Sequence, residues 1–351
     1  MTVRAEAVID LAALRSNLDY LSGSAVGGPE VARMVVVKAD AYGHGATEVA
    51  RVARDAGIRW LGVALPSEAL QLRAAGDAGR ILAWLYAPGD TDLAACVSAD
   101  VDLSVGSLGM LSDVTAAAVS AGRAARVHLK IDTGLGRGGC APDSWPDLLV
   151  AAVASPHIEV VGLWSHLASA DIPDAPETDE QVAAFEDALA AAERAGVRPE
   201  VRHLASSGAA LSRPETRYDL VRLGIATYGV PPGPAIAMGA LRPVMTLRAT
   251  VAATKRVPAG HGVSYGLTWR APRETTLALV PLGYGDGLPR TARGARVLLG
   301  GEQRPIVGRI AMDQVVVDVG AAPVSAGDEV IVWGPGQPDR GGSAAPPGPK
   351  R

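Results

Sequence analysis

The sequence predicts an α/β protein, an N-terminal (β/α)8 barrel of the TIM type followed by a mainly β domain. From about residue 11 to about residue 233, short apolar runs alternate with Ala-rich amphipathic segments, which is typical of a barrel. Residues 245–333 instead carry Val, Thr and Leu with turn signals at short intervals. A length of 351 residues suits one large and one smaller domain.

Eight apolar runs are candidates for the barrel strands. Several segments between them place apolar residues three and four positions apart and end in glycine, which predicts amphipathic helices with glycine C-caps. Such alternation implies parallel strands joined by right-handed crossovers. The eight runs are Met34–Lys38, Trp60–Ala64, Ile81–Leu85, Val101–Val105, Val127–Ile131, Val160–Trp164, Val201–Leu204 and Leu220–Ile225.

The residue composition and the spacing of turn signals change after the proline cluster "VPPGPAI". We expect a barrel domain over residues 1–234, with its first strand open to association with the second domain. A β domain follows over residues 235–334. Residues 335–351 are rich in Pro, Gly and Ser, with almost nothing to bury, and predict a disordered tail.

The composition excludes several classes of function. A hydrophobic content of 48% supports a sizeable core, and a net charge of −4 argues against nucleic acid or an anionic membrane as a partner. Cys96 and Cys140 lie far apart without metal-ligand spacing, which predicts neither a disulfide framework nor a metal site. The sequence shows no signal peptide and no membrane-spanning run, so we expect a cytoplasmic protein.

The stretch "VVVKADAYGHG" places Lys38 at the end of a predicted buried strand. Burying a lysine is costly, but desolvation lowers its pKa and frees the amine to form a Schiff base or accept a proton. Lysine can equally extend its amine into solvent at a strand end. This short stretch alone leaves both interpretations open.

Polar side chains also follow later strands, and the carboxyl ends of barrel strands form one active-site face. Singly, each has a structural explanation; His166, for example, is compatible with a core histidine. Together they predict an active site. "ASSG" and "RLGI" supply hydroxyls and backbone amides near the last strands, where barrels commonly hold a phosphate. A phosphate there and a lysine across the mouth predict pyridoxal phosphate.

Seven stretches, in order along the chain, resemble the motifs of the alanine racemase family. The resemblance extends from about residue 6 to about residue 334 and implies a fold-type III enzyme that binds pyridoxal phosphate. It also implies L-alanine and D-alanine as substrates, D-alanine supply for peptidoglycan, and a head-to-tail homodimer with shared active sites. The stretches are "VVKADAYGHG", "LKIDTGLGRGG", "SHLASAD", "VRLGIATYG", "GHGVSYG", "PLGYGDGLPR" and "GRIAMDQ".

The resemblance also implies the catalytic residues. Lys38 matches the lysine that carries the cofactor and acts as one base. Tyr265 matches the second base, contributed by the partner subunit, and His166 matches the histidine beside that tyrosine. Arg222 matches the arginine that faces the pyridine nitrogen. Two bases on opposite faces of a planar carbanion would allow racemisation without rotating the substrate.

Binding roles follow from the same resemblance. Arg137 and Met312 match substrate contacts, Met312 from the partner subunit, and Lys130 is a candidate for carbamylation. The residues that match phosphate contacts are Tyr42, Ser207, Gly224 and Ile225.

Two departures from the family pattern bear on activity. Ser206 replaces an asparagine before the phosphate-binding serine, and the family's last strand and terminal tyrosine are not found after Gly334. We therefore expect weakened cofactor retention and an unpaired strand edge. Two alternatives stay open: an amino-acid racemase of broader specificity, and a catalytically impaired cofactor-binding homologue. A decarboxylase of the same fold type fits the motifs less well.

Overall fold

The computed structural model describes residues 4–292 and 294–334, and the chain divides into two compact units. One unit is Leu14–Leu241, and the other joins Met1–Ala13 to Arg242–Arg351. The first strand, β1 (Ala5–Ile9), belongs to the second unit because it pairs antiparallel with β10 (Met245–Thr250). The sequence had left this association open, and the division falls after residue 241 rather than residue 234.

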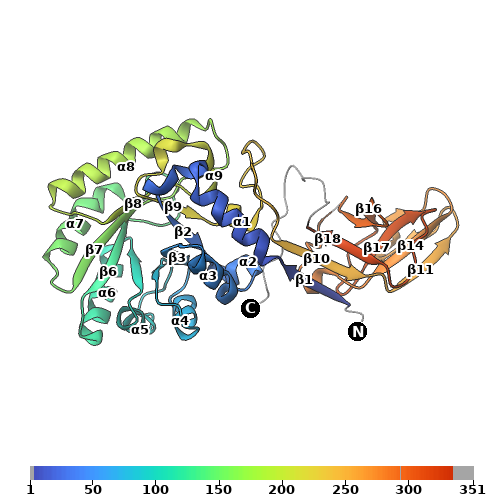
Figure 1. Ribbon diagram of the computed structural model, residues 1–351, viewed down its shortest axis with the longest axis horizontal. Coiled ribbons are helices and arrows are strands. Elements are labelled where there is room, and N and C mark those ends of the chain that lie inside the picture. Colours follow the sequence, from blue (N-terminus) through green and yellow to red (C-terminus); the bar gives the residue numbers. More distant parts are fainter. Residues whose placement is uncertain (1–3, 293, 335–351) are drawn as a thin grey trace. The chain divides into compact units, whose positions relative to one another are not determined.

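The Leu14–Leu241 unit is built on an eight-stranded parallel barrel (Figure 1). Neighbouring strands follow chain order, and the last strand pairs with the first. Backbone bonds from Asp219 N to the Arg202 carbonyl (3.1 Å) and from Arg222 N to the Ala205 carbonyl (3.0 Å) close the remaining gap. The strands are β2 (Ala32–Val36), β3 (Trp60–Val63), β4 (Arg80–Ala83), β5 (Asp102–Val105), β6 (Ala125–Lys130), β7 (Ile158–Trp164), β8 (Val201–His203) and β9 (Leu220–Leu223).

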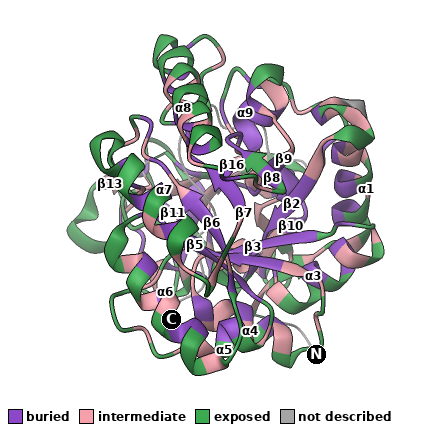
Figure 2. Ribbon diagram, turned by 90° about the vertical axis from the view of Figure 1, so that its left-hand side faces the viewer, coloured by how far each residue is buried: buried purple, intermediate pink, exposed green. Residues whose placement is uncertain are grey.

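Helices surround the strands and bury their apolar faces against them (Figure 2). In α3, for example, Val49, Val52 and Ala53 are buried while the charged face is exposed. Glycines in the left-handed conformation follow several of these helices, such as Gly122 at φ 68°. The helices are α1 (Leu11–Ser22), α3 (Ala46–Asp55), α4 (Pro66–Ala74), α5 (Leu93–Ser98), α6 (Leu108–Ala121), α7 (Trp145–Ala154), α8 (Pro176–Arg194) and α9 (Ser207–Ser212).

Each of the eight predicted barrel runs overlaps a strand, so the predicted barrel is confirmed. The predicted limits were wrong in detail, because tertiary pairing sets where a ladder ends. The run predicted to end at Lys38 stops pairing at Val36, and the run predicted to end at Ile225 stops at Leu223.

The other unit is an antiparallel β domain in which the described residues form no α-helix beyond the start of α1. An eight-stranded sheet in the order β1-β10-β18-β15-β16-β17-β14-β11 accompanies the hairpin β12-β13. The further strands are β11 (Ala253–Val257), β12 (Gly262–Val263), β13 (Trp269–Arg270), β14 (Thr275–Val280), β15 (Arg296–Leu299), β16 (Glu302–Val307), β17 (Val315–Gly320) and β18 (Glu329–Trp333).

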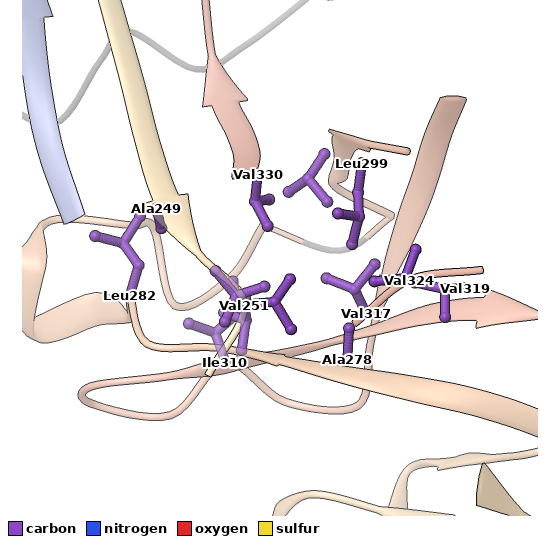
Figure 3. Packing of buried hydrophobic residues seen from close by; sticks show 13 residues of the cluster. Ala249, Val251, Ala278, Leu282, Leu299, Ile310, Val317, Val319, Val324 and Val330 are labelled. Atoms are coloured by element: carbon purple, nitrogen blue, oxygen red, sulfur yellow. The ribbon is translucent and has the colours of Figure 1, made fainter. Parts of the chain in front are cut away.

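The core of this domain is made of aliphatic side chains that alternate along the strands (Figure 3). Val315, Val317 and Val319 of β17 are at most 1% exposed, whereas the residues between them are half-buried. This alternation is expected of a sheet with one buried face. Each fully buried valine contributes roughly 1.5–3 kcal/mol through removal of apolar surface from water.

The unpaired strand edge expected from the missing family segment is not an edge of β18, which contains the "VIVWG" stretch, and the expectation itself stays a prediction. β18 is an inner strand, paired with β10 on one side and with β15 on the other. The predicted tail, residues 335–351, lies outside the described residues. Among the helices of the described part, none combines the length and the apolarity needed to cross a membrane.

Candidate active site

The segment after Lys38 is a single left-handed helical turn. Four consecutive residues, Ala39 to Tyr42, have φ between 51° and 57° and ψ between 33° and 53°. For L-amino acids this conformation costs roughly 1–2 kcal/mol per residue, because Cβ approaches the following carbonyl oxygen. The turn directs the chain from β2 into α3 within α2 (Lys38–Gly43) and carries Lys38 at its start. Contacts from elsewhere must hold such a strained turn in place.

Carboxylates supply part of that support. Glu68, at the start of α4, accepts a hydrogen bond from Ala39 N at 2.8 Å through Oε1. Its Oε2 accepts from Ala64 N at 2.9 Å and from Leu65 N at 3.0 Å. One side chain thus ties the residue after Lys38 to the loop that follows β3. Asp40 Oδ1 accepts from Ala46 N at 2.7 Å and fixes the end of the turn to α3.

We expect Glu68→Gln to destabilise the fold by roughly 1.5–3 kcal/mol, because an amide has only one acceptor oxygen for donors that now bind two. It should also lower the pKa of Lys38 further, since the charge of Glu68 raises that pKa. Chemical denaturation and the pH dependence of Lys38 acylation in cofactor-free protein measure the two effects. Glu48→Gln, on the exposed side of α3, is the matched control. Unchanged stability and acylation would contradict the proposed support.

A cavity of about 690 Å³ opens beside this turn, within the barrel unit. It is the size of a small-molecule site. Burial, with a smaller effect from the charge of Arg137, lowers the pKa of Lys38 below its ordinary value, although Glu68 opposes the shift. The nine barrel residues predicted for the site all line the cavity: Lys38, Tyr42, Lys130, Arg137, His166, Ser207, Arg222, Gly224 and Ile225.

Three of the predicted phosphate ligands meet at one corner of the cavity. Gly224 N donates to Ser207 Oγ at 2.9 Å. A Cβ on Gly224 would lie 2.5 Å from Tyr42 Oη, so only glycine permits this approach of the phenol to the backbone. Burial raises the pKa of Tyr42 to about 12, so the hydroxyl keeps its proton and can donate. Hydroxyls and amides gathered in this way suit an anion.

Arg222 lies across the floor of the cavity and is only 4% exposed. Its NH2 group donates to the Ser165 and Leu204 carbonyls at 2.9 and 2.8 Å, and NH1 donates to the His203 carbonyl at 3.1 Å. Burial lowers the pKa of Arg222 to about 9, which still leaves the guanidinium charged at neutral pH. The site therefore holds a fixed, donor-only cation.

His166 is held by the same guanidinium. Arg222 NH2 lies 3.0 Å from His166 Nδ1, and its two hydrogens are shared between that nitrogen and the Ser165 and Leu204 carbonyls. Because the guanidinium has no lone pair, a proton on Nδ1 would face its hydrogens, so Nδ1 carries the lone pair. Burial, together with the charges of Arg222, Arg137, Lys130 and Lys38, lowers the pKa of His166 to about 3. The imidazole is therefore neutral, with its proton on Nε2.

The cavity is lined by two tryptophans that the sequence analysis did not predict as site residues. The Lys130 amine lies 4.6 Å from the centre of a Trp164 ring, and the Arg222 guanidinium lies 4.9 Å from it. Lys38 Nζ lies 5.9 Å from a Trp84 ring. Both tryptophans lie at strand ends, and that position is a sign of the active-site face. In the sequence, however, a tryptophan in an apolar run is more simply interpreted as a core residue. Glu68 gave none, since its role depends on a contact 29 residues away.

Two predicted residues belong to the other unit and do not line the cavity. Tyr265 and Met312 are 70% and 54% exposed there, an unusual degree for large side chains. Ser264 before the tyrosine has φ 59°, and Ser264 Oγ donates to the Arg309 carbonyl at 2.6 Å. A fixed turn thus presents an uncovered phenol on the surface of this unit, which suits a contact with another chain.

The closed barrel and its lysine-bearing cavity define an enzyme that works at the carboxyl ends of parallel strands. Residues 9–232 match the family model of the alanine racemase N-terminal domain, and residues 244–344 match that of the C-terminal domain. The chain belongs to the alanine racemase family.

Individual relatives agree over nearly the whole chain. It is 51% identical to the alanine racemase of Frankia casuarinae over 346 residues, which cover 97% of this chain and 88% of that protein. Its identity to the alanine racemase of Thermobifida fusca is 50%, over 96% of this chain and 90% of that protein. The crystal structure of alanine racemase from Streptomyces lavendulae superimposes with a TM-score of 0.92 at 52% identity, covering 95% and 88% of the two chains.

Proposed function

We propose that this protein is an alanine racemase that interconverts L-alanine and D-alanine with pyridoxal phosphate held by Lys38. The observation that carries the proposal is the meeting of nine predicted barrel residues in one cavity. A lysine of lowered pKa, a donor-only arginine and an anion-binding corner surround the same space.

The residues present fit this cofactor. Tyr42, Ser207 and the amides of Gly224 and Ile225 would hold its phosphate, and Lys38 would hold its carbonyl carbon. Arg222 would face its ring nitrogen. Among the described residues, the hydrogen bonds of Arg222 use NH1 and NH2, which leaves its Nε–H as a donor for a ligand. A donor opposite the ring nitrogen disfavours protonation of that nitrogen, because the two would then present hydrogens to each other.

Racemisation is then a matter of moving one proton between two faces. Pyridoxal phosphate, when bound, supplies the electron-withdrawing ring that acidifies the α-hydrogen of an amino acid. Lys38, whose amine is easier to deprotonate because of burial, serves as the base on one face. We propose that Tyr265 of the partner subunit serves the other face, within a homodimer, and that the neutral His166 lies beside it. Arg137 and the partner subunit's Met312 would contact the substrate carboxylate.

Lys130 is expected to react with carbon dioxide. Burial, followed by the charges of Arg222 and Arg137, lowers its pKa to about 8, although Asp132 opposes the shift. Carbamate formation requires the neutral amine, whose fraction rises as the pH approaches and passes the pKa. We therefore expect a carbamate signal from isotope-labelled bicarbonate in nuclear magnetic resonance spectra, growing from pH 7 to pH 8.5. Lys130→Arg should lack the signal, and its persistence in that variant would assign it elsewhere.

The proposal is tested by racemisation of L-alanine with added pyridoxal phosphate, read together with the visible absorbance of the bound cofactor. Formation of D-alanine with cofactor bound is the expected result. Bound cofactor without D-alanine would favour the impaired homologue. Serine and valine, tested in parallel, decide between an alanine-selective enzyme and one of broader specificity. Absence of both cofactor binding and turnover would overturn the proposal.

A further inference from the structure

A chain of buried polar side chains leads from Arg222 into the barrel interior. Arg222 NH1 lies 3.0 Å from His203 Nδ1, and His203 Nε2 lies 2.9 Å from His128 Nδ1. His128 Nε2 then lies 3.3 Å from Asp102 Oδ2. His203, His128 and Asp102 are all 0% exposed. Buried polar groups are costly unless each is paired, so the protons in this chain must be arranged consistently.

The end at Arg222 fixes the direction of every hydrogen bond. Since the guanidinium can only donate, His203 Nδ1 must accept, and the proton of His203 must be on Nε2. That proton is donated to His128 Nδ1, so the proton of His128 is on Nε2 and is donated to Asp102. Reversing one ring would bring two N–H groups, or two lone pairs, face to face. Burial, with the charge of Arg222, lowers the pKa of His203 well below its ordinary value, consistent with a neutral ring.

The other end of the chain is fixed by a carboxylate. Arg80 NH2 donates to Asp102 Oδ2 at 2.7 Å, and Arg126 Nε donates to Asp102 Oδ1 at 2.6 Å. Burial alone would raise the pKa of Asp102, but the hydrogen bond from His128 and the charges of Arg80 and Arg126 outweigh it and lower the pKa. Asp102 therefore remains an acceptor. A donor-only cation and an acceptor-only anion set the same direction from opposite ends.

The backbone makes room for this chain at one glycine. His128 is on β6 and His203 is on β8, so β7 lies between their strands. Gly162 of β7 is paired with His128, and a Cβ there would lie 2.1 Å from His128 Nδ1. Trp164 stacks on His203, with ring centres 5.4 Å apart and planes 6° apart. The strands concerned, β5 to β8, are among the largely buried strands labelled near the centre of Figure 2.

We propose that Asp102, His128 and His203 form a positioning relay for Arg222. The relay keeps the lone pair of His203 directed at Arg222 NH1 and so holds the guanidinium with Nε–H toward a ligand in the cavity. This inference deepens the proposed function and rests on it for the role of the ligand. The three residues act through Arg222 and touch neither substrate nor cofactor.

The proton arrangement is tested first, in cofactor-free protein. Nitrogen-15 spectra of histidine-labelled protein should show neutral Nε2–H rings for both His128 and His203, assigned by loss of each signal in a single His→Gln variant. A Nδ1–H or doubly protonated ring at either position would overturn the relay. This readout does not depend on turnover, so it stands even if the protein proves not to racemise alanine.

The functional role is tested by a pair of variants at His128. His128→Gln keeps an acceptor oxygen and a donor NH2 in line, so it should preserve the relay, whereas His128→Leu removes both. We expect His128→Leu to lower kcat roughly ten- to hundredfold, by analogy with the loss of a residue that orients a metal ligand, with a much smaller change in the KM for alanine. The absorption spectrum of the bound cofactor should also change. His128→Gln should restore both readouts to near wild-type values.

A matched control separates the relay from loss of stability. Asp77 is another buried carboxylate held by two arginines, Arg54 and Arg73, but it has no link to Arg222. Asp77→Asn should destabilise the barrel while leaving kcat and the cofactor spectrum unchanged. Equal kcat and equal spectra in His128→Leu and His128→Gln would overturn the relay. If His128→Leu does not fold, the tautomers of the wild-type protein still decide.

Discussion

Replacing Lys38 by alanine is expected to abolish racemisation, because in the proposed mechanism the covalent attachment of the cofactor and one of the two bases disappear together. A positioned base alone contributes on the order of 10²–10⁴ to the rate. Borohydride reduction of the cofactor-loaded wild-type protein, followed by peptide mapping, should place the pyridoxyl group on Lys38.

Lys255→Ala is the matched control, since Lys255 is exposed on β11 and should be dispensable for turnover. A pyridoxyl group on Lys130 would overturn the assignment. Lys130 is the other lysine that lines the cavity and whose pKa is lowered by burial.

Tyr265→Ala is expected to slow removal of the α-hydrogen from one enantiomer of alanine by roughly 10²–10⁴-fold and to affect the other enantiomer much less. Exchange of the α-hydrogen with heavy water, followed separately for L-alanine and D-alanine, measures this asymmetry. Leu267→Ala, a neighbouring exposed residue, is the control for damage to the turn. Equal slowing for both enantiomers would count against the assignment.

The same variant tests whether sites are shared between subunits. Lys38→Ala and Tyr265→Ala chains should each be inactive as homodimers. In a mixed dimer with shared sites, one site receives both intact bases, so mixing under subunit exchange should restore part of the activity. Absence of recovery in dimers shown by mass spectrometry to be mixed would refute sharing.

The barrel was predictable because its strands coincide with short runs of mainly apolar residues that can be recognised locally. Runs such as Trp60–Val63 and Ile81–Ala83 are apolar at every position, as expected of strands buried on both faces. The site was predictable for a related reason: in a barrel, polar groups after strands converge whatever their distance in sequence. Lys130 and Arg222 both lie against the Trp164 ring although they are far apart along the chain.

The features that could not be predicted from the sequence depend on contacts between distant residues, which no local pattern indicates. The residues from Ala39 to Tyr42 carry no glycine, and nothing in their composition indicates a left-handed turn. Asp102 begins β5, where a carboxylate would ordinarily face solvent, yet it is 0% exposed because Arg80 and Arg126 from neighbouring strands enclose it. Partners of this kind are known only once the strands are paired.

The left-handed turn after Lys38 also leads to an expectation about the order in which the chain folds. Its four residues are locally unfavourable, so the turn cannot nucleate structure and must wait for the groups that hold it. Glu68 is supplied by α4, which follows β3, and Tyr228, which donates to the Val36 carbonyl at 2.8 Å, is supplied by the segment after the last barrel strand. We therefore expect the turn that carries Lys38 to be ordered only after the barrel strands have paired, so that the proposed active site forms late in folding.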